Sequence, residues 1–219
     1  MAQFKGLIFD LDGTLIDSWQ DIFAAFNWAL QSCGQPCVDP QELKPLMGCG
    51  MYDLLDARLG EKSAEGRALM QAYYQDNLAH KTALFSGVSE VLAQLQAKGI
   101  MMAICTNKHS KLALPLIKKF KLDQYLLAYN QGFALEKAII CRDTLSISKP
   151  QPDGLLWLCD KMQLPREQVL MVGDTKTDYL AAKAASMPIA LCHFGYGDCS
   201  QLEPDYWLHS FFDLVDIVL

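Results

Sequence analysis

Two aspartates near the start of the chain, Asp10 and Asp12, carry the strongest chemical signal in the sequence. They follow the apolar run Leu7–Phe9, and a Gly-Thr turn comes directly after them. Residues i and i+2 of a β-strand lie on the same side, so both carboxylates can face one pocket. Because close carboxylates repel each other, the pair favours a bound cation. The spacing therefore indicates a hard divalent metal, with one carboxylate as nucleophile and the other as general acid or base.

A strand that ends in solvated acids has the same local pattern, so the rest of the chain must distinguish the two interpretations. Short apolar runs flanked by turn residues predict buried strands at Leu7–Phe9, Ile100–Cys105, Val169–Val172 and Ile189–Cys192. Helical patterns lie between them at Val88–Lys98, Leu112–Phe120, Leu155–Met162 and Tyr179–Ala185. This alternation predicts an α/β fold with a doubly wound, Rossmann-like parallel sheet and helices on both faces.

Residues 17–81 have a different character. Amphipathic helices are predicted at Asp21–Leu30, Met51–Leu59 and Glu65–His80, and this stretch contains no convincing strand. An all-helical insert directly after the first strand predicts a small separate cap. We therefore expect a core of residues 1–16 and 82–219 and a cap of residues 17–81. The cap would cover the carboxyl end of the sheet, where α/β proteins bind ligands.

Composition restricts the class of protein. The chain has 219 residues, of which 51% are hydrophobic, and a formal charge of -6, which argues against nucleic-acid binding. The eight cysteines form no C-x-x-C pair and the four histidines are scattered, so a zinc site is not expected. The start has no signal-peptide pattern, and no apolar run is long enough to span a membrane. We expect a cytoplasmic protein without membrane or nucleic-acid partners.

Three further segments carry reactive side chains, and the first and the last of them fall at predicted strand ends. They are Thr106-Asn107-Lys108, Lys149-Pro150 and the stretch from Gly173-Asp174 to Asp178. Each has an ordinary interpretation as a capped turn, a solvated loop lysine or a surface acid. The ends of parallel strands converge on one crevice, however, so a hydroxyl, an amide, a lysine and four carboxylates are expected to meet there.

In this order and spacing, the segments resemble the four motifs of the haloacid dehalogenase superfamily. The supporting stretches are Phe9-Asp-Leu-Asp-Gly-Thr-Leu-Ile-Asp-Ser18, Thr106-Asn-Lys108, Asp143-Thr-Leu145, Lys149-Pro-Gln-Pro152 and Phe194-Gly-Tyr-Gly197. The resemblance covers nearly the whole chain and is strongest to the phosphoglycolate phosphatase group. Gln151 stands where that group usually has a histidine, a departure that bears on the substrate more than on the chemistry.

The resemblance implies a set of roles for the carboxylates. Asp10 would be the nucleophile that forms an aspartyl-phosphate. Asp12 would protonate the leaving alcohol and then activate water, a role that haloalkanoic acid dehalogenases do not need. Mg²⁺ would be held by Asp10, the backbone carbonyl of Asp12 and Asp174, while Asp178 would act through a metal-bound water or by orienting its neighbours.

The resemblance also implies a phosphate site and a substrate-selecting cap. Thr106 and the backbone amide of Asn107 would bind phosphate oxygens, and Lys149 would neutralise charge on the nucleophile and the phosphoryl group. In the cap, Gly48 and Gly50 would bring backbone amides to the ligand. Three cations are candidate partners for a substrate carboxylate: Arg58, Lys44 and Arg67.

The sequence thus predicts a Mg²⁺-dependent phosphatase acting on a small phosphorylated metabolite, with 2-phosphoglycolate as the first candidate. A β-phosphoglucomutase-type phosphomutase, a pyrophosphatase and a 5′-nucleotidase of the same superfamily remain alternatives. A non-catalytic phosphate-binding module is a further one, although all catalytic positions are filled. Whether the protein is a monomer or a homodimer is left open.

Overall fold

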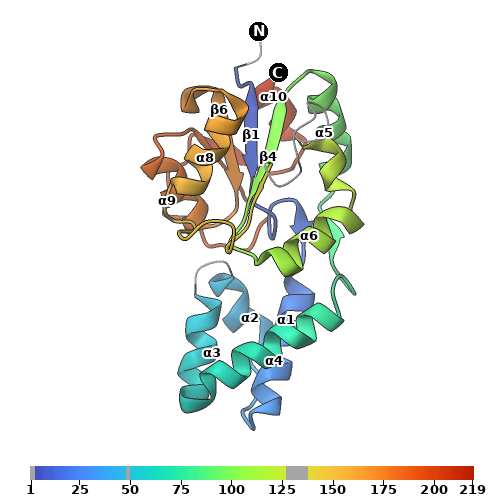
Figure 1. Cartoon of the computed structure of the whole chain (residues 1–219), viewed down its shortest axis with the longest axis vertical. Coiled ribbons are helices and arrows are strands. Elements are labelled where there is room, and N and C mark those ends of the chain that lie inside the picture. The colour runs from blue at the N-terminus through green and yellow to red at the C-terminus, as the bar shows by residue number, and fades with distance from the viewer. Residues whose placement is uncertain (1–2, 48–49, 127–137) are drawn as a thin grey trace.

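A six-stranded parallel sheet forms the centre of the larger of two lobes in this computed structural model (Figure 1). The structure describes residues 3–47, 50–126 and 138–219. The strand order is β5-β4-β1-β6-β7-β8, and each neighbouring pair is parallel. The strands are β1 (Gly6–Phe9), β4 (Met101–Cys105), β5 (Ile139–Ile140), β6 (Val169–Gly173), β7 (Ile189–Cys192) and β8 (Tyr206–Leu208). The doubly wound α/β class predicted from the sequence is confirmed.

The position of β1 determines where the site forms. β1 lies between β4 and β6, and Phe9 is in register with Ile104 on one side and Val172 on the other. Every residue of β1 and β6 is buried, as expected for continuous apolar runs in a sheet covered on both faces. The chain leaves β1 and β6 at the same edge of the sheet, so the acids that follow these strands are brought together.

Helices cover both faces of the sheet. α8 (Asp153–Met162) and α9 (Lys176–Ala184) pack on one face, whereas α5 (Val88–Ala97) and α10 (Asp213–Val218) contact each other on the opposite face (Figure 1). α6 (Ser110–Lys119) lies at the end of the sheet that faces the smaller lobe. Short 3₁₀ turns occur at η1 (Lys44–Leu46), η2 (Gly60–Lys62), η3 (Leu122–Tyr125) and η5 (Arg166–Gln168).

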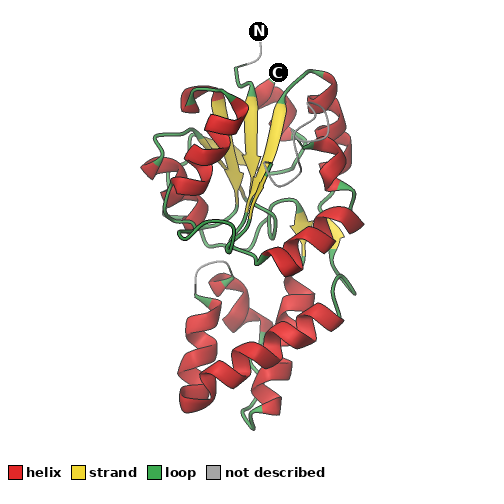
Figure 2. Ribbon diagram, in the orientation of Figure 1, coloured by secondary structure: helices red, strands yellow, loops and turns green. Residues whose placement is uncertain are grey.

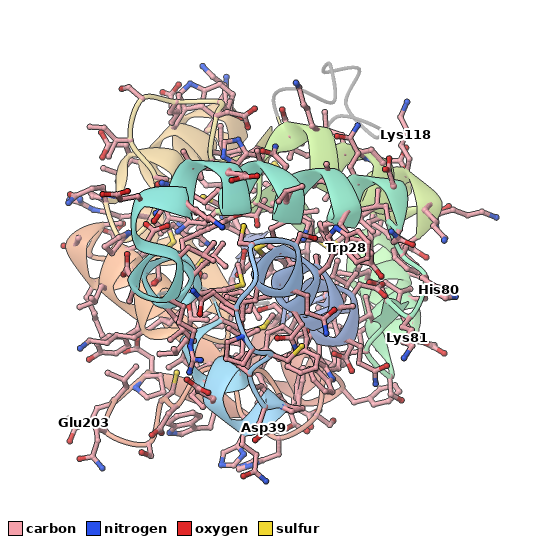
Figure 3. All side chains as sticks on the ribbon, turned by 90° about the horizontal axis from the view of Figure 1, so that it is seen from below. Trp28, Asp39, His80, Lys81, Lys118 and Glu203 are labelled. Carbon is pink, nitrogen blue, oxygen red and sulfur yellow. The ribbon has the colours of Figure 1, made fainter. Side chains whose placement is uncertain are left out.

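The smaller lobe is helical and has its own apolar core. It contains α1 (Trp19–Ser32), α2 (Pro40–Leu43), α3 (Met51–Leu59) and α4 (Ser63–Asp76). Seen from the end of this lobe, α4 crosses α1 (Figure 3). Phe26, Leu30, Leu55 and Met70 are buried between these helices, and on the surface Trp28 stacks on Tyr73. We refer to this lobe as the cap.

Two short strands connect the cap to the sheet domain. β2 (Ile16–Asp17) and β3 (Ala83–Leu84) pair antiparallel where the two lobes meet (Figure 2). The carboxylate of Asp21, in the first turn of α1, accepts hydrogen bonds from the backbone amides of Lys81 and Thr82 at 2.9–3.0 Å. These hydrogen bonds tie the two chain crossings between the lobes to each other.

Some elements did not appear in the sequence prediction. β5, β8, β2 and β3 contain only two or three residues each, too few to show a periodicity. α9 begins three residues earlier than predicted because Thr175 and Asp178 form a capping box at its start. Within the described residues, no helix has the length and apolarity needed to cross a membrane, and every cysteine is a free thiol.

Candidate active site

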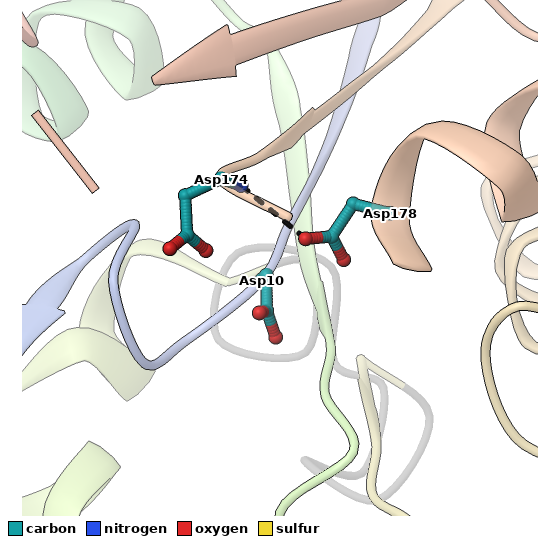
Figure 4. Close-up of side chains that lie close together, drawn as sticks. All are labelled: Asp10, Asp174 and Asp178. Atoms are coloured by element: carbon teal, nitrogen blue, oxygen red, sulfur yellow. Dashed lines mark hydrogen bonds between the residues drawn. The ribbon is translucent and has the colours of Figure 1, made fainter. Parts of the chain in front are cut away.

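Three carboxylates form a buried cluster at the edge of the sheet (Figure 4). Asp10 follows β1, Asp174 follows β6, and Asp178 lies in the first turn of α9. One oxygen from each carboxylate lies within 4.8 Å of the other two. Asp174 and Asp178 have no exposed surface, and Asp10 is 8% exposed. The parallel pairing of β1 with β6 has therefore placed three acids from distant parts of the sequence in one small volume.

The cluster holds more negative charge than the protein neutralises. Burial raises the pKa of Asp10 to about 6, although the Lys149 ammonium opposes this shift. Burial, together with Asp178 and Asp10, also raises the pKa of Asp174 well above its usual range. Lys149 Nζ lies 3.0 Å from Asp10 Oδ1 and 2.5 Å from Asp178 Oδ1. Burial alone would lower the pKa of Lys149, but the two carboxylates outweigh it and keep the ammonium charged.

The cluster has the properties of a Mg²⁺ site. Oδ1 of Asp10 is buried and, apart from its ion pair with Lys149, has no hydrogen-bond partner, so it can also bind a cation. The oxygens of Asp174 are oriented by Thr14 Oγ1 at 3.2 Å and by the backbone amide of Tyr196 at 2.8 Å. The available donors are carboxylate oxygens, which hard divalent cations prefer. The residues present therefore fit the metal that the sequence predicts.

Two glycines leave room for the Asp174 carboxylate. A Cβ on Gly13 or on Gly195 would overlap it, and Gly13 also has a φ of +85°. We expect Gly13→Ala to lower Mg²⁺ affinity by at least about 10-fold, because the new methyl displaces an oriented ligand. Isothermal titration of Mg²⁺ into the protein measures this effect. Gly34→Ala is the matched control, since Gly34 has a φ of +80° with nothing within 4 Å. Equal affinities in the two variants would contradict the role of the carboxylate.

Asp178 has most of its hydrogen-bonding capacity occupied. Its Oδ2 accepts hydrogen bonds from the backbone amides of Asp174 and Thr175 at 3.2 and 3.0 Å, and from the Thr175 hydroxyl at 2.7 Å. Its Oδ1 accepts a hydrogen bond from Lys149. Asp178 therefore fixes the turn that carries Asp174 and holds the lysine beside Asp10.

The residues after β4 form the opposite wall of the site. Thr106 is 3% exposed, and its hydroxyl accepts a hydrogen bond from the backbone amide of Lys108 at 3.2 Å. The side-chain amide of Asn107 donates to the Lys149 carbonyl at 2.9 Å. Asn107 thereby links the strand end that carries Thr106 to the segment that carries Lys149, so both groups face the same cavity.

Asp12 lies beside the cluster rather than in it. Its carboxylate accepts a hydrogen bond from Ser18 Oγ at 2.5 Å, and Lys108 Nζ lies 3.0 Å from each of its oxygens. Lys108 Nζ also donates to the Tyr74 hydroxyl at 2.9 Å. The two aspartates of the first segment are thus separated by environment, since Asp10 contacts Lys149 and Asp12 contacts Lys108.

A cavity of about 450 Å³ lies between the sheet domain and the cap. The sheet domain contributes Asp10, Asp12, Thr106, Asn107, Lys108, Arg142, Lys149 and Asp178 to its walls, among others. The cap contributes Met47, Gly50, Met51, Tyr52, Arg67, Met70 and Tyr74, among others. A carboxylate such as Asp10, beside an ammonium and a group of oxygen atoms that fits a cation, is suited to interact with an anionic electrophile. The apolar cap side chains leave room for a larger group attached to that electrophile.

The structure places some of the predicted cap residues at the cavity and others away from it. Gly50 and Arg67 line the cavity, and Arg67 is also paired with Asp56. Arg58 pairs with Glu42 and does not line the cavity. Lys44 lies 5.7 Å from the centre of the Trp19 ring, also outside the lining. The predicted position Gly48 falls outside the described residues.

Sequence reasoning assigned no role to three side chains that contact site residues. Lys108 contacts Asp12 directly, and Tyr74 is connected to Asp12 through Lys108. The Tyr196 hydroxyl accepts hydrogen bonds from the backbone amides of Ser18 and Trp19. For Lys108, its place two residues after Thr106 in the same segment was the one available signal of a role in the site. The other two are separated from their partners by 34 and about 178 residues.

Known proteins resemble the chain along its whole length. The family described as Haloacid dehalogenase-like hydrolase matches residues 7–192. A phosphoglycolate phosphatase of Photobacterium profundum is 32% identical over 235 residues, covering 100% of this chain and 98% of that protein. One of Chromobacterium violaceum is 31% identical over 227 residues, with the same coverage. The crystal structure of a predicted phosphoglycolate phosphatase from Haemophilus somnus 129pt has a TM-score of 0.87 at 28% identity, covering 99% of both chains.

Proposed function

Because the chain belongs to the haloacid dehalogenase-like hydrolases and is a phosphoric monoester hydrolase, we propose that it is a Mg²⁺-dependent phosphatase acting on 2-phosphoglycolate through an aspartyl-phosphate at Asp10. The observation that carries the proposal is that the two aspartates of the first segment lie in different environments. Asp10 lies beside a cation site and Lys149, whereas Asp12 faces the same cavity from outside the carboxylate cluster. One carboxylate is thus available for attack and the other for proton transfer.

In the first half of the reaction, a carboxylate oxygen of Asp10 forms a bond to phosphorus. The bond between phosphorus and the ester oxygen breaks, and Asp12 gives its proton to that oxygen so that the alcohol leaves neutral. General acid catalysis of this kind is worth about 10²–10⁴-fold. Mg²⁺, when bound by Asp10, Asp174 and the Asp12 carbonyl, supplies positive charge that offsets repulsion between the nucleophile and the phosphate dianion.

In the second half, water attacks the phosphorus of the aspartyl-phosphate. Asp12 takes the proton from this water, the bond between phosphorus and the Asp10 oxygen breaks, and inorganic phosphate is released. Asp12 ends the cycle protonated and Asp10 ends it as a free carboxylate, so the proton balance is closed. Thr106 and the backbone amide of Asn107 bind phosphate oxygens throughout, and Lys149 stabilises the charge that moves between Asp10 and phosphate.

The choice of 2-phosphoglycolate rests on the relatives and on the charges around the cavity. The relatives named above carry the name phosphoglycolate phosphatase at 31–32% identity over their full lengths. Arg67 and Arg142 line the cavity, but the Arg67 guanidinium is already paired with Asp56. Arg142 is therefore the better suited of the two to the substrate carboxylate, because guanidinium groups bind carboxylates in a fork geometry. Arg58, which pairs with Glu42 outside the lining, has no part in this assignment.

A metabolite panel tests the substrate. We expect kcat/KM to be highest for 2-phosphoglycolate, with free phosphate as the product and full loss of turnover in excess EDTA that Mg²⁺ restores. A sugar 1-phosphate is included as a control, since isomerisation without phosphate release would indicate a mutase. A higher kcat/KM for a nucleoside monophosphate or pyrophosphate would contradict the choice of 2-phosphoglycolate but leave the phosphatase chemistry intact. Turnover that persists without a divalent cation would contradict the mechanism.

A further inference from the structure

Lys108 connects the sheet domain to the cap through a saturated set of hydrogen bonds. An ammonium has three donors. Lys108 Nζ donates to both oxygens of Asp12, at 3.0 Å each, and to the Tyr74 hydroxyl at 2.9 Å. The Lys108 side chain is 7% exposed and Tyr74 is 4% exposed. A long side chain is therefore held in one place, with every donor used and little contact with solvent.

These contacts cross between the lobes. Lys108 and Asp12 follow strands β4 and β1 of the sheet domain, whereas Tyr74 belongs to α4 of the cap. Lys108 Nζ also lies 4.4 Å from the centre of the Tyr74 ring, so the hydroxyl and the ring both restrain it. The order of contacts runs from the cap through Lys108 to Asp12. The position of the cap thus bears directly on a carboxylate of the site.

We propose that Lys108 and Tyr74 are positioning residues that fix the orientation of Asp12 for proton transfer to the leaving group. The inference rests on the proposed role of Asp12 as general acid. Lys108 contacts both carboxylate oxygens, which prevents rotation about the bond to the carboxyl carbon. Without it, Ser18 is the remaining side-chain hydrogen-bond partner of Asp12 among the described residues. Tyr74 acts through Lys108, so full alignment is reached when the cap lies as it does here.

Two substrates that differ only in their leaving group can distinguish a positioning role of Lys108 from a general effect of its charge or of folding. Phenyl phosphate and p-nitrophenyl phosphate have nearly the same shape and charge, but p-nitrophenolate leaves readily without a proton and phenolate does not. Loss of the Lys108 charge weakens binding of both phosphate dianions alike. Loss of alignment at Asp12 slows phenyl phosphate more. The ratio of the two kcat/KM values therefore reports on proton transfer and cancels the shared binding effect.

The experiment measures this ratio with Mg²⁺ in the wild type, Lys108→Met, Tyr74→Phe and the double variant. We expect the ratio of phenyl to p-nitrophenyl phosphate to fall about 10-fold in Lys108→Met and about threefold in Tyr74→Phe, a part of the full general-acid effect. The double variant should match Lys108→Met alone, because Tyr74 acts through the lysine. Asp12→Asn, which removes the proposed general acid itself, should give the largest decrease in this ratio.

Matched controls come from the same helices. Tyr73→Phe removes a hydroxyl from α4 beside Tyr74, and Lys111→Met removes an exposed charge from α6; both should leave the ratio unchanged. An equal loss for both esters in Lys108→Met and Tyr74→Phe would overturn the positioning role. An unchanged ratio in Asp12→Asn would remove the general acid and this inference with it. A wild-type protein that hydrolyses neither these esters nor any phosphomonoester of the metabolite panel would instead refute the proposed function on which both depend.

Discussion

Asp10→Asn is expected to lower turnover by at least about 10⁵-fold and yet to raise the melting temperature of the metal-free protein. An amide oxygen is a poor nucleophile and carries no charge for a divalent cation, so neither the aspartyl-phosphate nor the full metal site can form. The side chains are almost equal in size, so the substitution leaves the packing around β1 unchanged. The two expected effects have opposite signs because the carboxylate proposed as the nucleophile is held at a cost in stability.

The sign of the stability effect follows from the pKa of Asp10. Burial raises this pKa from 3.8 to about 6. An acid with a raised pKa in the folded state favours folding when it is protonated, and this advantage is lost as pH rises from about 4 to about 6. At pH 7 the buried charge costs up to about 3 kcal/mol, at 1.36 kcal/mol per pKa unit. Asparagine removes that cost.

Thermal unfolding in EDTA at pH 7 and pH 4 measures the effect. The variant should be more stable than the wild type at pH 7, and the difference should narrow at pH 4, where the wild-type carboxyl is protonated. If Asp10→Asn were less stable than the wild type at pH 7, burial of the Asp10 charge would not be destabilising and the prediction would be wrong. The residual turnover of Asp10→Asn is compared with that of the double variant Asp10→Asn, Asp12→Asn. Equal rates in the two preparations would identify a contaminating phosphatase.

The positions of these acids could be predicted because they depend on strand order. A buried apolar run ending in Asp10, and another ending in Asp174, predict two carboxylates at one sheet edge once the sheet is parallel. The pairing of each acid could not be predicted. Whether an aspartate contacts Lys149 or Lys108 depends on side-chain directions at three strand ends, and sequence spacing does not determine these directions.

The cap was harder to predict than the sheet domain. Its helices follow from periodicity, but the face that each presents to the cavity depends on how α1 and α4 cross. Arg58 and Arg67 both read as solvated helix charges, and only the packing of α3 against α4 places Arg67 at the cavity and Arg58 beside Glu42. Tyr74 likewise reads as a core aromatic residue, since nothing in its neighbourhood indicates a lysine 34 residues away.

Lys149→Met is expected to have the second largest effect, a loss of turnover of about 10³-fold together with a loss of stability. Lys149 is 5% exposed and contacts Asp10 at 3.0 Å and Asp178 at 2.5 Å. Methionine preserves the apolar length of the side chain but removes the charge that these two acids share. Breaking a buried ion pair from one side costs about 3–5 kcal/mol, because the remaining charge is left uncompensated. Urea unfolding in EDTA at pH 7 measures the change in free energy.

Two comparisons show whether the cause is charge. Lowering the pH to 5 should reduce the destabilisation in Lys149→Met, because the unpaired carboxyls then take up protons more readily. Lys149→Gln, which is also uncharged, should be destabilised to a similar extent. A loss of stability that does not change between pH 7 and pH 5 would point to packing instead of charge.

Combining Asp10→Asn with Lys149→Met provides the sharpest test of the charge balance at this site. If the lysine mainly compensates Asp10, the substitution Asp10→Asn should stabilise the Lys149→Met background more than it stabilises the wild type. In the wild type the ammonium already offsets part of the cost of the buried carboxylate, whereas in the variant nothing does. The coupling energy from the double-mutant cycle should therefore be about 1–3 kcal/mol. Strict additivity would mean that Lys149 serves Asp178 rather than the nucleophile, and the charge-neutralising role of Lys149 at Asp10 would then have to be abandoned.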